Sequence, residues 1–410
     1  MSATGQRRLA IVAPTAYLLG GVQTWLDYLV PGLEAAGWQV TVLLVNGVLS
    51  DAHRYLIHHP FPRVHLVENR TGSREGRVRA LGDAIGRVDP ELVLTVNIVD
   101  AYEAVARLRS GEGAPKVVMA LHALNPSFYG DIAEWSAVLD GVIATNRLGA
   151  AAAVVCAGLP EHRVHYAPCG VLVRELPAPE QAPSELKLLY AGRFDVAEKR
   201  VLDLPPVLRA LDRCGLKFTL KLAGSGPAEA ELRLALLDFG DRVEFMGVLS
   251  EAQLRASFFR PGALALVLSP SETGPLVAWE ALANGVAVVS SRFVGMGLEG
   301  SLRVGETCLS FPVGDTEAAA AAIARLSDSA LRQSLARAGY AMVRKRYGRD
   351  VSSSLGRGAP KYLQPSGASL GSFLRKDARS RATGSLSWGR QGGKRASAAW
   401  AAVPSWRGWR

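Results

Sequence analysis

Short apolar runs alternate with longer amphipathic stretches throughout the chain before residue 348, and no other feature restricts the fold as much. The runs are rich in Val, Leu and Ile and mostly free of polar residues, which is typical of parallel strands buried on both faces. Strands that alternate with helices predict doubly wound α/β sheets. We expect strands at Leu9–Ala13, Val40–Val45, Val64–Val67, Leu92–Val96, Lys116–Leu121, Gly141–Thr145, Val164–Ala167, Leu186–Ala191, Phe218–Ala223, Val243–Met246, Ala263–Leu268, Val286–Ser290 and Cys308–Phe311.

The predicted strands form two sets, separated by a segment of different composition. Residues 174–185 contain three prolines and few apolar residues, as an interdomain linker does. We therefore predict Rossmann-like domains at residues 1–175 and 186–348, a linker at 176–185 and a tail at 349–410. Two such domains would face each other across a cleft, bordered by the carboxyl ends of their strands. Helices are expected at Gln23–Ala36, Ala228–Leu237, Pro275–Asn284, Thr316–Arg325 and near Ala336–Tyr347.

The C-terminal tail carries the whole net charge of the protein. Residues 351–410 hold eleven Lys or Arg and one Asp, which equals the net charge of +10, so residues 1–350 are neutral. The segment is also rich in Ser, Gly and Ala and holds four of the eight Trp, a composition that favours disorder. Contact with anionic lipid or RNA, and out-of-frame translation, are the alternatives. Because the rest of the chain is neutral, no nucleic-acid partner is expected for the globular part.

The remaining composition argues against several classes of protein. No stretch of about 20 apolar residues is free of charge, so we expect no membrane-spanning helix. The apolar run that ends at Pro14 favours a first buried strand over a secretory signal. The four cysteines are scattered without a CxxC pair, as in reduced cytoplasmic proteins. Without a DxD pair or a histidine cluster, no protein-bound metal is predicted. We expect a cytoplasmic location, with peripheral contact at the inner membrane left open.

Two carboxylates lie eight positions apart across a predicted strand-to-helix junction. Glu272 falls in the loop after the strand Ala263–Leu268, and Glu280 lies about one and a half turns into the helix Pro275–Asn284. The exposed N–H groups at such a helix start suit an anion or sugar hydroxyls. On its own, the pair fits a nucleotide-sugar site, the acid and base of a glycosidase, or two solvated surface carboxylates.

The loop after the strand Leu186–Ala191 carries two cations. Arg193 offers a planar fork for phosphate and Lys199 a point charge, so that together they would stabilise a departing diphosphate. Two solvated surface cations are the alternative interpretation. The following segment Ala223–Pro227 reads AGSGP, a second glycine turn. Its glycines either admit a ligand to the backbone or, as we favour, only make the turn.

Taken in this order, the motifs resemble the second domain of the group 1 glycosyltransferases, glycosyltransferase family 4, which have the GT-B fold. The matching segments are AGRF with the later lysine, AGSGP, VEFMG, and SE-x7-E followed by ALANGVAVVSS. In the first half, residues 19–23, 33–42 and 166–171 are similar to the glycine loop, second strand and closing P-N-G-V turn of that family. The resemblance covers about residues 8–348, and the order and spacing of the motifs make it specific.

The resemblance implies a hexosyltransferase that retains the anomeric configuration of an NDP-sugar donor and needs no metal. By this resemblance, Glu280 would accept hydrogen bonds from the ribose, and Glu272 would lie near the donor sugar. Arg193 and Lys199 would hold the diphosphate. No cofactor is implied, since the NDP-sugar is a co-substrate. The acceptor class stays open among a glycan, a glycolipid and a small molecule.

Other residues of this sequence match positions around the donor in that family. Gly274, Pro275 and Leu276 would line the sugar and the phosphates. Gly21 would bring its backbone N–H toward the donor across the cleft, and His122 would lie near the reacting sugar. A buried or surface histidine with only a structural role is the alternative for His122.

The sequence also departs from the family pattern. Gly274 replaces a usual aromatic residue, and Cys169 replaces the asparagine of the P-N-G-V turn. The last helix of the family normally returns to brace the first domain, and here it is followed by the basic tail. Two other functions therefore stay open: a non-catalytic binding protein of the same fold, and a protein that associates with membranes or nucleic acid through its tail.

Overall fold

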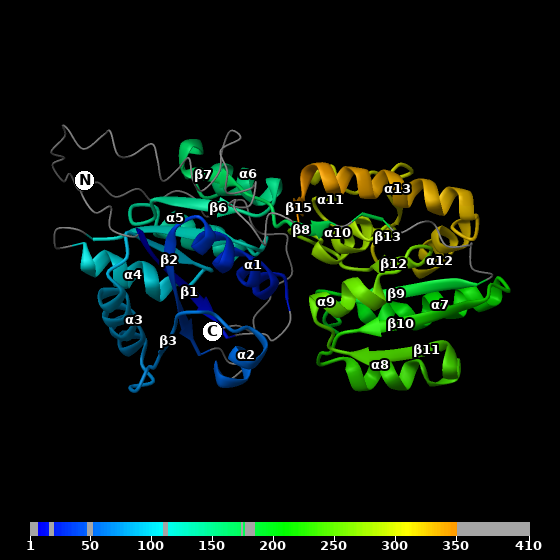
Figure 1. Cartoon of the computed structure of the whole chain (residues 1–410), viewed down its shortest axis with the longest axis horizontal. Coiled ribbons are helices and arrows are strands. Elements are labelled where there is room, and N and C mark those ends of the chain that lie inside the picture. Colours follow the sequence, from blue (N-terminus) through cyan, green and yellow to red (C-terminus); the bar gives the residue numbers. More distant parts are fainter. Residues whose placement is uncertain are drawn as a thin grey trace, which may run out of the picture.

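The computed structural model describes residues 7–15, 20–46, 52–109, 114–173, 175–176 and 185–350. Within these ranges, two parallel sheets lie side by side with helices around each (Figure 1). The predicted doubly wound α/β architecture is confirmed. Residues 177–184 of the predicted linker and residues 351–410 of the predicted tail lie outside the described residues, so the statements about those segments stay predictions.

The first sheet has seven strands in the order β3-β2-β1-β4-β5-β6-β7, and all of its strand pairs are parallel. The order reverses between β1 and β4, which is the topological switch point where open α/β sheets bind ligands. Each of its strands overlaps one predicted from the sequence. The strands are β1 (Arg7–Pro14), β2 (Trp38–Val45), β3 (Val64–Val67), β4 (Leu92–Thr95), β5 (Lys116–Leu121), β6 (Gly141–Ala144) and β7 (Val164–Tyr166).

The second sheet repeats this topology with six parallel strands in the order β11-β10-β9-β12-β13-β14. Its switch point lies between β9 and β12. All six strands were predicted, with ends that differ by one residue at most. They are β9 (Leu186–Ala191), β10 (Phe218–Ala223), β11 (Val243–Gly247), β12 (Leu264–Val267), β13 (Ala287–Ser291) and β14 (Leu309–Phe311).

Helices connect the strands and cover both faces of each sheet. In the first domain they are α1 (Gly21–Ala35), α2 (Ala52–His58), α3 (Arg74–Val88), α4 (Val99–Leu108), α5 (Pro126–Glu134) and α6 (Arg147–Val155). In the second they are α7 (Leu204–Arg213), α8 (Glu229–Ala235), α9 (Glu251–Gln253), α10 (Leu276–Ala283), α11 (Met296–Glu299), α12 (Thr316–Arg325) and α13 (Ser329–Arg346). Short helical turns lie at Glu161–Arg163, Val201–Asp203, Leu237–Arg242 and Leu254–Phe258.

The central strands of each sheet are largely apolar because both of their faces are buried. Leu9 and Ile11 of β1 belong to one apolar cluster, with the buried face of α1, whereas Ala10 and Val12 belong to another, with α3 and α4. Successive side chains of a strand point to opposite faces, so a strand covered on both sides needs apolar residues at every position. The cluster that contains Leu9 continues into the second domain, across the boundary between the two domains that is called the seam below.

Two short strands were not predicted. β8 (Val171–Val173) follows the first sheet, and β15 (Gly348–Asp350) follows α13, and the two pair in parallel between the domains (Figure 1). The N–H of Val171 also donates to the carbonyl of Tyr347 at 2.9 Å. The last helix thus packs on α10 and delivers the chain to the segment that leaves the first domain, rather than to the first sheet.

A buried carboxylate joins the two domains at the seam. Glu299 of α11 is 6% exposed, and its carboxylate accepts from the backbone N–H of Arg147 at 2.5 Å and from the hydroxyl of Tyr166 at 2.6 Å. Its carbonyl accepts from the hydroxyl of Tyr347 at 2.9 Å. Because the N-terminus of α6 attracts negative charge, this contact also caps a helix of the opposite domain. These hydrogen bonds from Arg147 and Tyr166 of the first domain to Glu299 of the second hold the two domains together.

Candidate functional site

The predicted site residues lie at the carboxyl ends of strands, on both sides of the seam. Arg193 and Lys199 follow β9, and Glu272 follows β12, so they flank the switch point of the second sheet. Gly21 begins α1 directly after β1 and its loop, and His122 follows β5 in the first sheet. The fold thus brings residues that are distant in sequence to two facing sheet edges, where a ligand is expected.

Lys199 and Glu272 form an ion pair across the switch point of the second sheet. The Nζ of Lys199 lies 2.6 Å from Oε1 of Glu272, and their side chains are only 27% and 13% exposed. A pair so withdrawn from water interacts more strongly than an exposed one. Glu272 and Lys199 are therefore not solvated surface residues.

Arg193 lies on the same loop but makes a different ion pair. Its guanidinium donates to the carboxylate of Glu198, a residue that the sequence analysis did not select. The hydroxyl of Tyr190 donates to the carbonyl of Arg193 at 2.9 Å and so fixes the loop. Burial, followed by the negative charge of Glu272, raises the pKa of Tyr190, and the positive charge of Arg193 opposes this shift.

The glycines of the second turn, Gly224 and Gly226, allow two loops to pack closely backbone against backbone. A Cβ on Gly224 would lie 1.9 Å from the carbonyl oxygen of Gly192, and one on Gly226 would lie 2.5 Å from that of Phe194. The N–H of Phe194 donates to the carbonyl of Ser225 at 2.9 Å. Only glycine fits such close approach of two loops, which supports the interpretation that these glycines make the turn.

The loop that carries Glu272 is bonded to the first domain through a residue that the sequence analysis missed. The hydroxyl of Thr273 donates to the carbonyl of His122 at 2.5 Å, and its own carbonyl accepts from Thr145 at 3.5 Å. Nearby, a methyl group on Gly21 would lie 3.5 Å from Cδ1 of Leu276. The sequence holds no signal for these contacts, because threonine hydroxyls bond to carbonyls in many settings.

His122 is enclosed at the first-domain side of this contact. Its ring meets Trp25 of α1 edge-on, with centroids 4.4 Å apart. Its Nε2 is buried without a hydrogen-bond partner, and burial lowers the pKa of His122 to about 3. The imidazole is therefore neutral at neutral pH, so it can exchange hydrogen bonds with a substrate hydroxyl but brings no positive charge.

This low pKa predicts a pH-dependent stability. An unfolded histidine titrates near pH 6.5, so between about pH 3 and 6.5 the unfolded chain binds a proton that folded His122 does not. The free energy of unfolding should therefore rise with pH over this interval, and His122→Gln should remove part of that rise. Urea denaturation at several pH values between about 4 and 8 measures it. His162→Gln, at an exposed site, is the control, and an unchanged slope for His122→Gln would contradict the burial of this ring.

The start of α10 is built as the sequence predicts, with a tight turn before it. Leu276 is the first helical residue, and its N–H donates to the carbonyl of Gly274 at 2.7 Å across Pro275. Glu280 is half-buried on the first turns of this helix, and Asn284 donates to its carbonyl at 2.7 Å. Gly274 approaches the ring of Trp279, which a Cβ would meet at 3.6 Å.

A polar residue that the sequence analysis did not select lies at the switch point of the first sheet. Asn97 follows β4 in a left-handed conformation with φ of 48°, and its side-chain nitrogen donates to Asp131 at 3.3 Å. Burial raises the pKa of Asp131 above its usual range. An asparagine directly after a predicted buried strand is the sequence signal that would have identified this position, because asparagine adopts the left-handed conformation more readily than most residues.

Several expectations about composition concern the same regions. Within the described ranges, no group of three or more His, Cys, Asp or Glu residues is arranged to hold a metal ion. The four cysteines, all of which fall in those ranges, form no disulfide. None of the helices in that part of the chain is long and apolar enough to cross a membrane.

Sequence models of known families match both domains. The model described as "Glycosyltransferase Family 4" matches residues 19–174, and the one described as "Glycosyl transferases group 1" matches residues 185–329. Together they extend over most of the chain and over both sheets. The protein belongs to the group 1 glycosyltransferases, glycosyltransferase family 4.

A curated relative shares one part of the sequence. The GDP-mannose-dependent alpha-(1-6)-phosphatidylinositol dimannoside mannosyltransferase of Mycobacterium tuberculosis is 34% identical over 110 residues, in strains H37Ra and CDC 1551 alike. The match spans 27% of this chain and 28% of that enzyme, so it covers little more than a quarter of the relative.

Solved structures match nearly the whole fold at low identity. Anabaena HepE with UDP and glucose is 17% identical, with a TM-score of 0.63 over 82% of this chain and 95% of its own. Sucrose-phosphate synthase of Thermosynechococcus elongatus is 22% identical, with a TM-score of 0.65 over 83% and 95%. The pneumococcal O-GlcNAc transferase GtfA is 12% identical, with a TM-score of 0.67 over 84% and 96%. These likenesses establish the GT-B fold.

Proposed function

We propose that the protein transfers a sugar from an NDP-sugar to the hydroxyl of an acceptor, with retention of configuration and without a bound metal. The acceptor oxygen forms a bond to the anomeric carbon on the face from which the diphosphate leaves. The bond between that carbon and the phosphate oxygen breaks, and the acceptor proton passes to the departing diphosphate. Catalysis on this proposal rests on positioning and on stabilisation of the charge of the diphosphate.

One observation carries the proposal: the loop that holds Glu272 is bonded directly to the strand end that holds His122. The hydrogen bond of 2.5 Å from Thr273 to the carbonyl of His122 joins a cationic site in the second domain to a neutral buried imidazole in the first. Lys199, which is paired with Glu272, would bind the diphosphate. The unpartnered Nε2 of His122 has the chemistry to bond a sugar hydroxyl in the same space.

Arg193 completes the proposed diphosphate site. Its guanidinium would leave Glu198 and bind the phosphate that Lys199 does not reach, as a planar fork does best. The N–H groups at the start of α10, beside Leu276, add a second set of donors for anionic or hydroxylated groups. The arrangement requires no nucleophilic side chain.

The names of the similar proteins guide the choice of probes. GDP-mannose, UDP-glucose and UDP-GlcNAc form the first panel, tested for thermal stabilisation, because a ligand that binds the folded state raises its stability. A donor that stabilises the protein is then offered acceptors, and the anomeric configuration of the product is read by NMR, with and without a chelator. Binding without turnover of any donor would favour a non-catalytic binding protein, the alternative suggested by glycine at position 274.

Glu280 gives a specific test of the ribose contact. We expect Glu280→Gln to weaken UDP binding by about 1.5–3 kcal/mol, the range for hydrogen bonds to a charged group. Dideoxy-UDP, which lacks both ribose hydroxyls, should bind wild type and variant equally. Calorimetry with both ligands measures the difference, and an equal loss for UDP and dideoxy-UDP would exclude a ribose role. Glu244→Gln, an exposed carboxylate of the same domain, is the control.

A further inference from the structure

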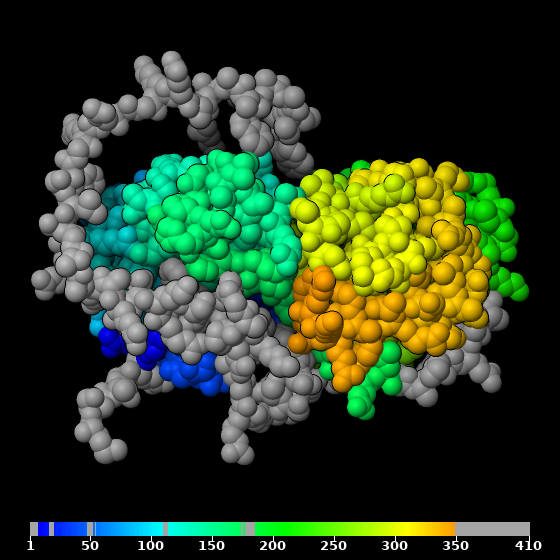
Figure 2. Space-filling model, turned by 90° about the horizontal axis from the view of Figure 1, so that it is seen from above, coloured from blue at the N-terminus to red at the C-terminus, as the bar shows by residue number. Residues whose placement is uncertain are grey.

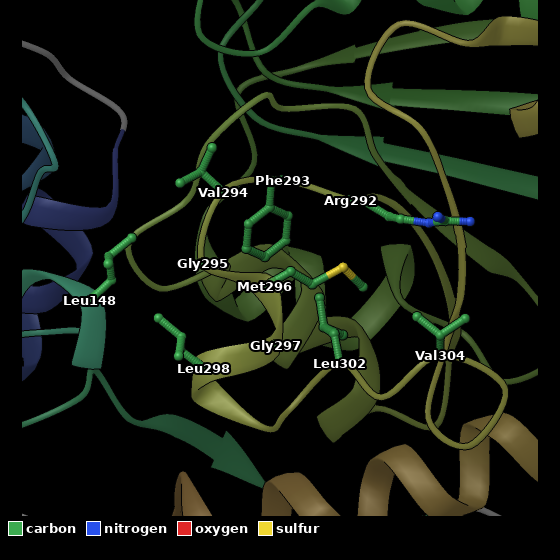
Figure 3. Close-up of a pocket in the computed structure, with 10 residues that line it drawn as sticks. All are labelled: Leu148, Arg292, Phe293, Val294, Gly295, Met296, Gly297, Leu298, Leu302 and Val304. Carbon is green, nitrogen blue, oxygen red and sulfur yellow. The ribbon is translucent and has the colours of Figure 1, made fainter.

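An apolar pocket lies at the seam, beside the proposed donor site. It has a volume of about 580 Å³ and lies among the loop after β13, helix α11, the loop before β14 and one residue of α6 (Figure 3). This volume is within the range of about 300–1,000 Å³ that small-molecule sites have. Arg292 is the one charged residue of its lining, and the rest is apolar or glycine: Leu148, Phe293, Val294, Gly295, Met296, Gly297, Leu298, Leu302 and Val304.

Three aliphatic side chains of this pocket are exposed together. Val294 is 58% exposed, Leu298 52% and Val304 59%. A single exposed aliphatic residue needs no explanation, but these three line one pocket together with Met296 and Leu302. Figure 2 shows the second domain meeting the first along this side of the molecule. Covering such a surface with an apolar ligand lowers the free energy, because apolar area is removed from water.

The pocket is continuous with the loop of Glu272. The N–H of Val294 donates to the carbonyl of Pro270 at 3.0 Å, and Val294 forms a parallel bridge with Ser271, the residue before Glu272. Leu148 faces the pocket from the first domain, near the carboxyl end of β6 (Figure 3). A ligand seated here therefore touches both domains and lies next to the proposed donor site.

Arg292 gives the pocket a charged end. Its guanidinium lies toward Val304, at the end opposite Leu148 (Figure 3). Arg292 is exposed, its Nε donates to the hydroxyl of Ser310 at 3.3 Å, and among the described residues it forms no ion pair. An apolar pocket with one cation at its end is complementary to an anionic amphiphile, since the cation would be matched by a phosphate and the apolar lining by a hydrocarbon chain.

We propose that this pocket binds the hydrocarbon chain of a lipid-linked acceptor whose phosphate contacts Arg292. The proposal rests on the proposed glycosyl transfer, because it names the acceptor class of the same site. In this arrangement the hydrocarbon chain lies between Leu148 and Leu298, and the phosphate lies at the Arg292 end of the pocket. Water-soluble sugars gain nothing from such a lining, whereas an acyl or prenyl chain removes its three exposed aliphatic side chains from water.

Binding of dodecyl phosphate, measured by calorimetry below its micelle concentration, tests the proposal on the full chain. Wild type should bind dodecyl phosphate at least about 10-fold more tightly than dodecyl maltoside, since a charge-assisted contact exceeds 1.4 kcal/mol. Leu298→Asp should weaken dodecyl phosphate binding by at least the same factor, and Arg292→Gln should abolish the preference for the phosphate. Leu234→Asp, on α8 and 70% exposed in wild type, should change neither.

Three outcomes would overturn the proposal. The first is an equal loss of dodecyl phosphate binding in Leu298→Asp and Leu234→Asp. The second is competition by inorganic phosphate that is as strong as that by dodecyl phosphate itself. The third is self-association by light scattering that Leu298→Asp abolishes, which would make this face an interface between two copies of the chain. Affinity for UDP and GDP is measured in the same samples. If wild type binds UDP or GDP but not dodecyl phosphate, only this inference is wrong. If wild type binds neither nucleotide, the proposed function is wrong.

Discussion

Lys199→Ala is expected to lower kcat/KM for the NDP-sugar by about 10²–10³-fold, the cost of removing one preorganised group that stabilises developing charge. Lys199 is 27% exposed and lies 2.6 Å from Glu272, so it sits where water screens it poorly. Its loss removes the proposed cation at the diphosphate and leaves the carboxylate of Glu272 without this partner. Affinity for UDP and GDP should fall by about 1.5–3 kcal/mol, the range for hydrogen bonds to charged groups.

A second ion pair of the same domain provides the control for Lys199→Ala. Lys221 lies 2.9 Å from Glu244 on neighbouring strands, and their side chains are 47% and 55% exposed. Lys221→Ala should leave kcat/KM unchanged and cost about 0–1 kcal/mol of stability, as surface pairs do. Calorimetry and initial rates are measured on both variants. Unchanged affinity for both nucleotides in Lys199→Ala would exclude this lysine from the diphosphate site.

Much of the fold can be predicted from local sequence patterns. Buried parallel strands must be apolar on both faces, so most of the thirteen strands in the two large sheets stand out as short apolar runs. The start of α10 is equally local, because Pro275 and Gly274 prepare the turn before its first residue. Strand ends then predict site residues, since Arg193 and Glu272 follow strands that topology makes neighbours.

What the sequence did not reveal depends on contacts between distant segments. β8 and β15 are three residues each, too short for a periodic pattern, and they exist because their chains meet at the seam. Thr273 and Glu299 act through single hydrogen bonds to the opposite domain, and nothing in their own neighbourhoods announces a partner. The apolar pocket likewise combines Leu148 with residues far along the chain. Such features follow from the placement of the domains, not from local pattern.

The largest effect on stability is expected for Trp279→Ala, with a loss of about 3–5 kcal/mol in the free energy of unfolding. Trp279 is fully buried in α10, and its ring stacks on Tyr347 with centroids 4.1 Å apart and planes inclined by 16°. Truncation leaves a cavity beneath Gly274 and removes the contact between the proposed donor helix and the returning end of α13. Urea denaturation measures the loss, and UDP affinity should also fall because Glu280 is the next residue.

Tyr347→Phe is the matched control, because it keeps the stacked ring and removes only the hydroxyl that donates to the carbonyl of Glu299 at 2.9 Å. It should cost about 1 kcal/mol, the usual contribution of one hydrogen bond. Tyr347→Ala combined with Trp279→Ala should cost less than the sum of the two, since both remove the same stack. Strict additivity, or a loss from Trp279→Ala no greater than that from Tyr347→Phe, would show that the stack does not tie α10 to the chain end. Coupling would instead make the returning segment a structural support of the donor helix, so damage to either would be felt as weaker donor binding.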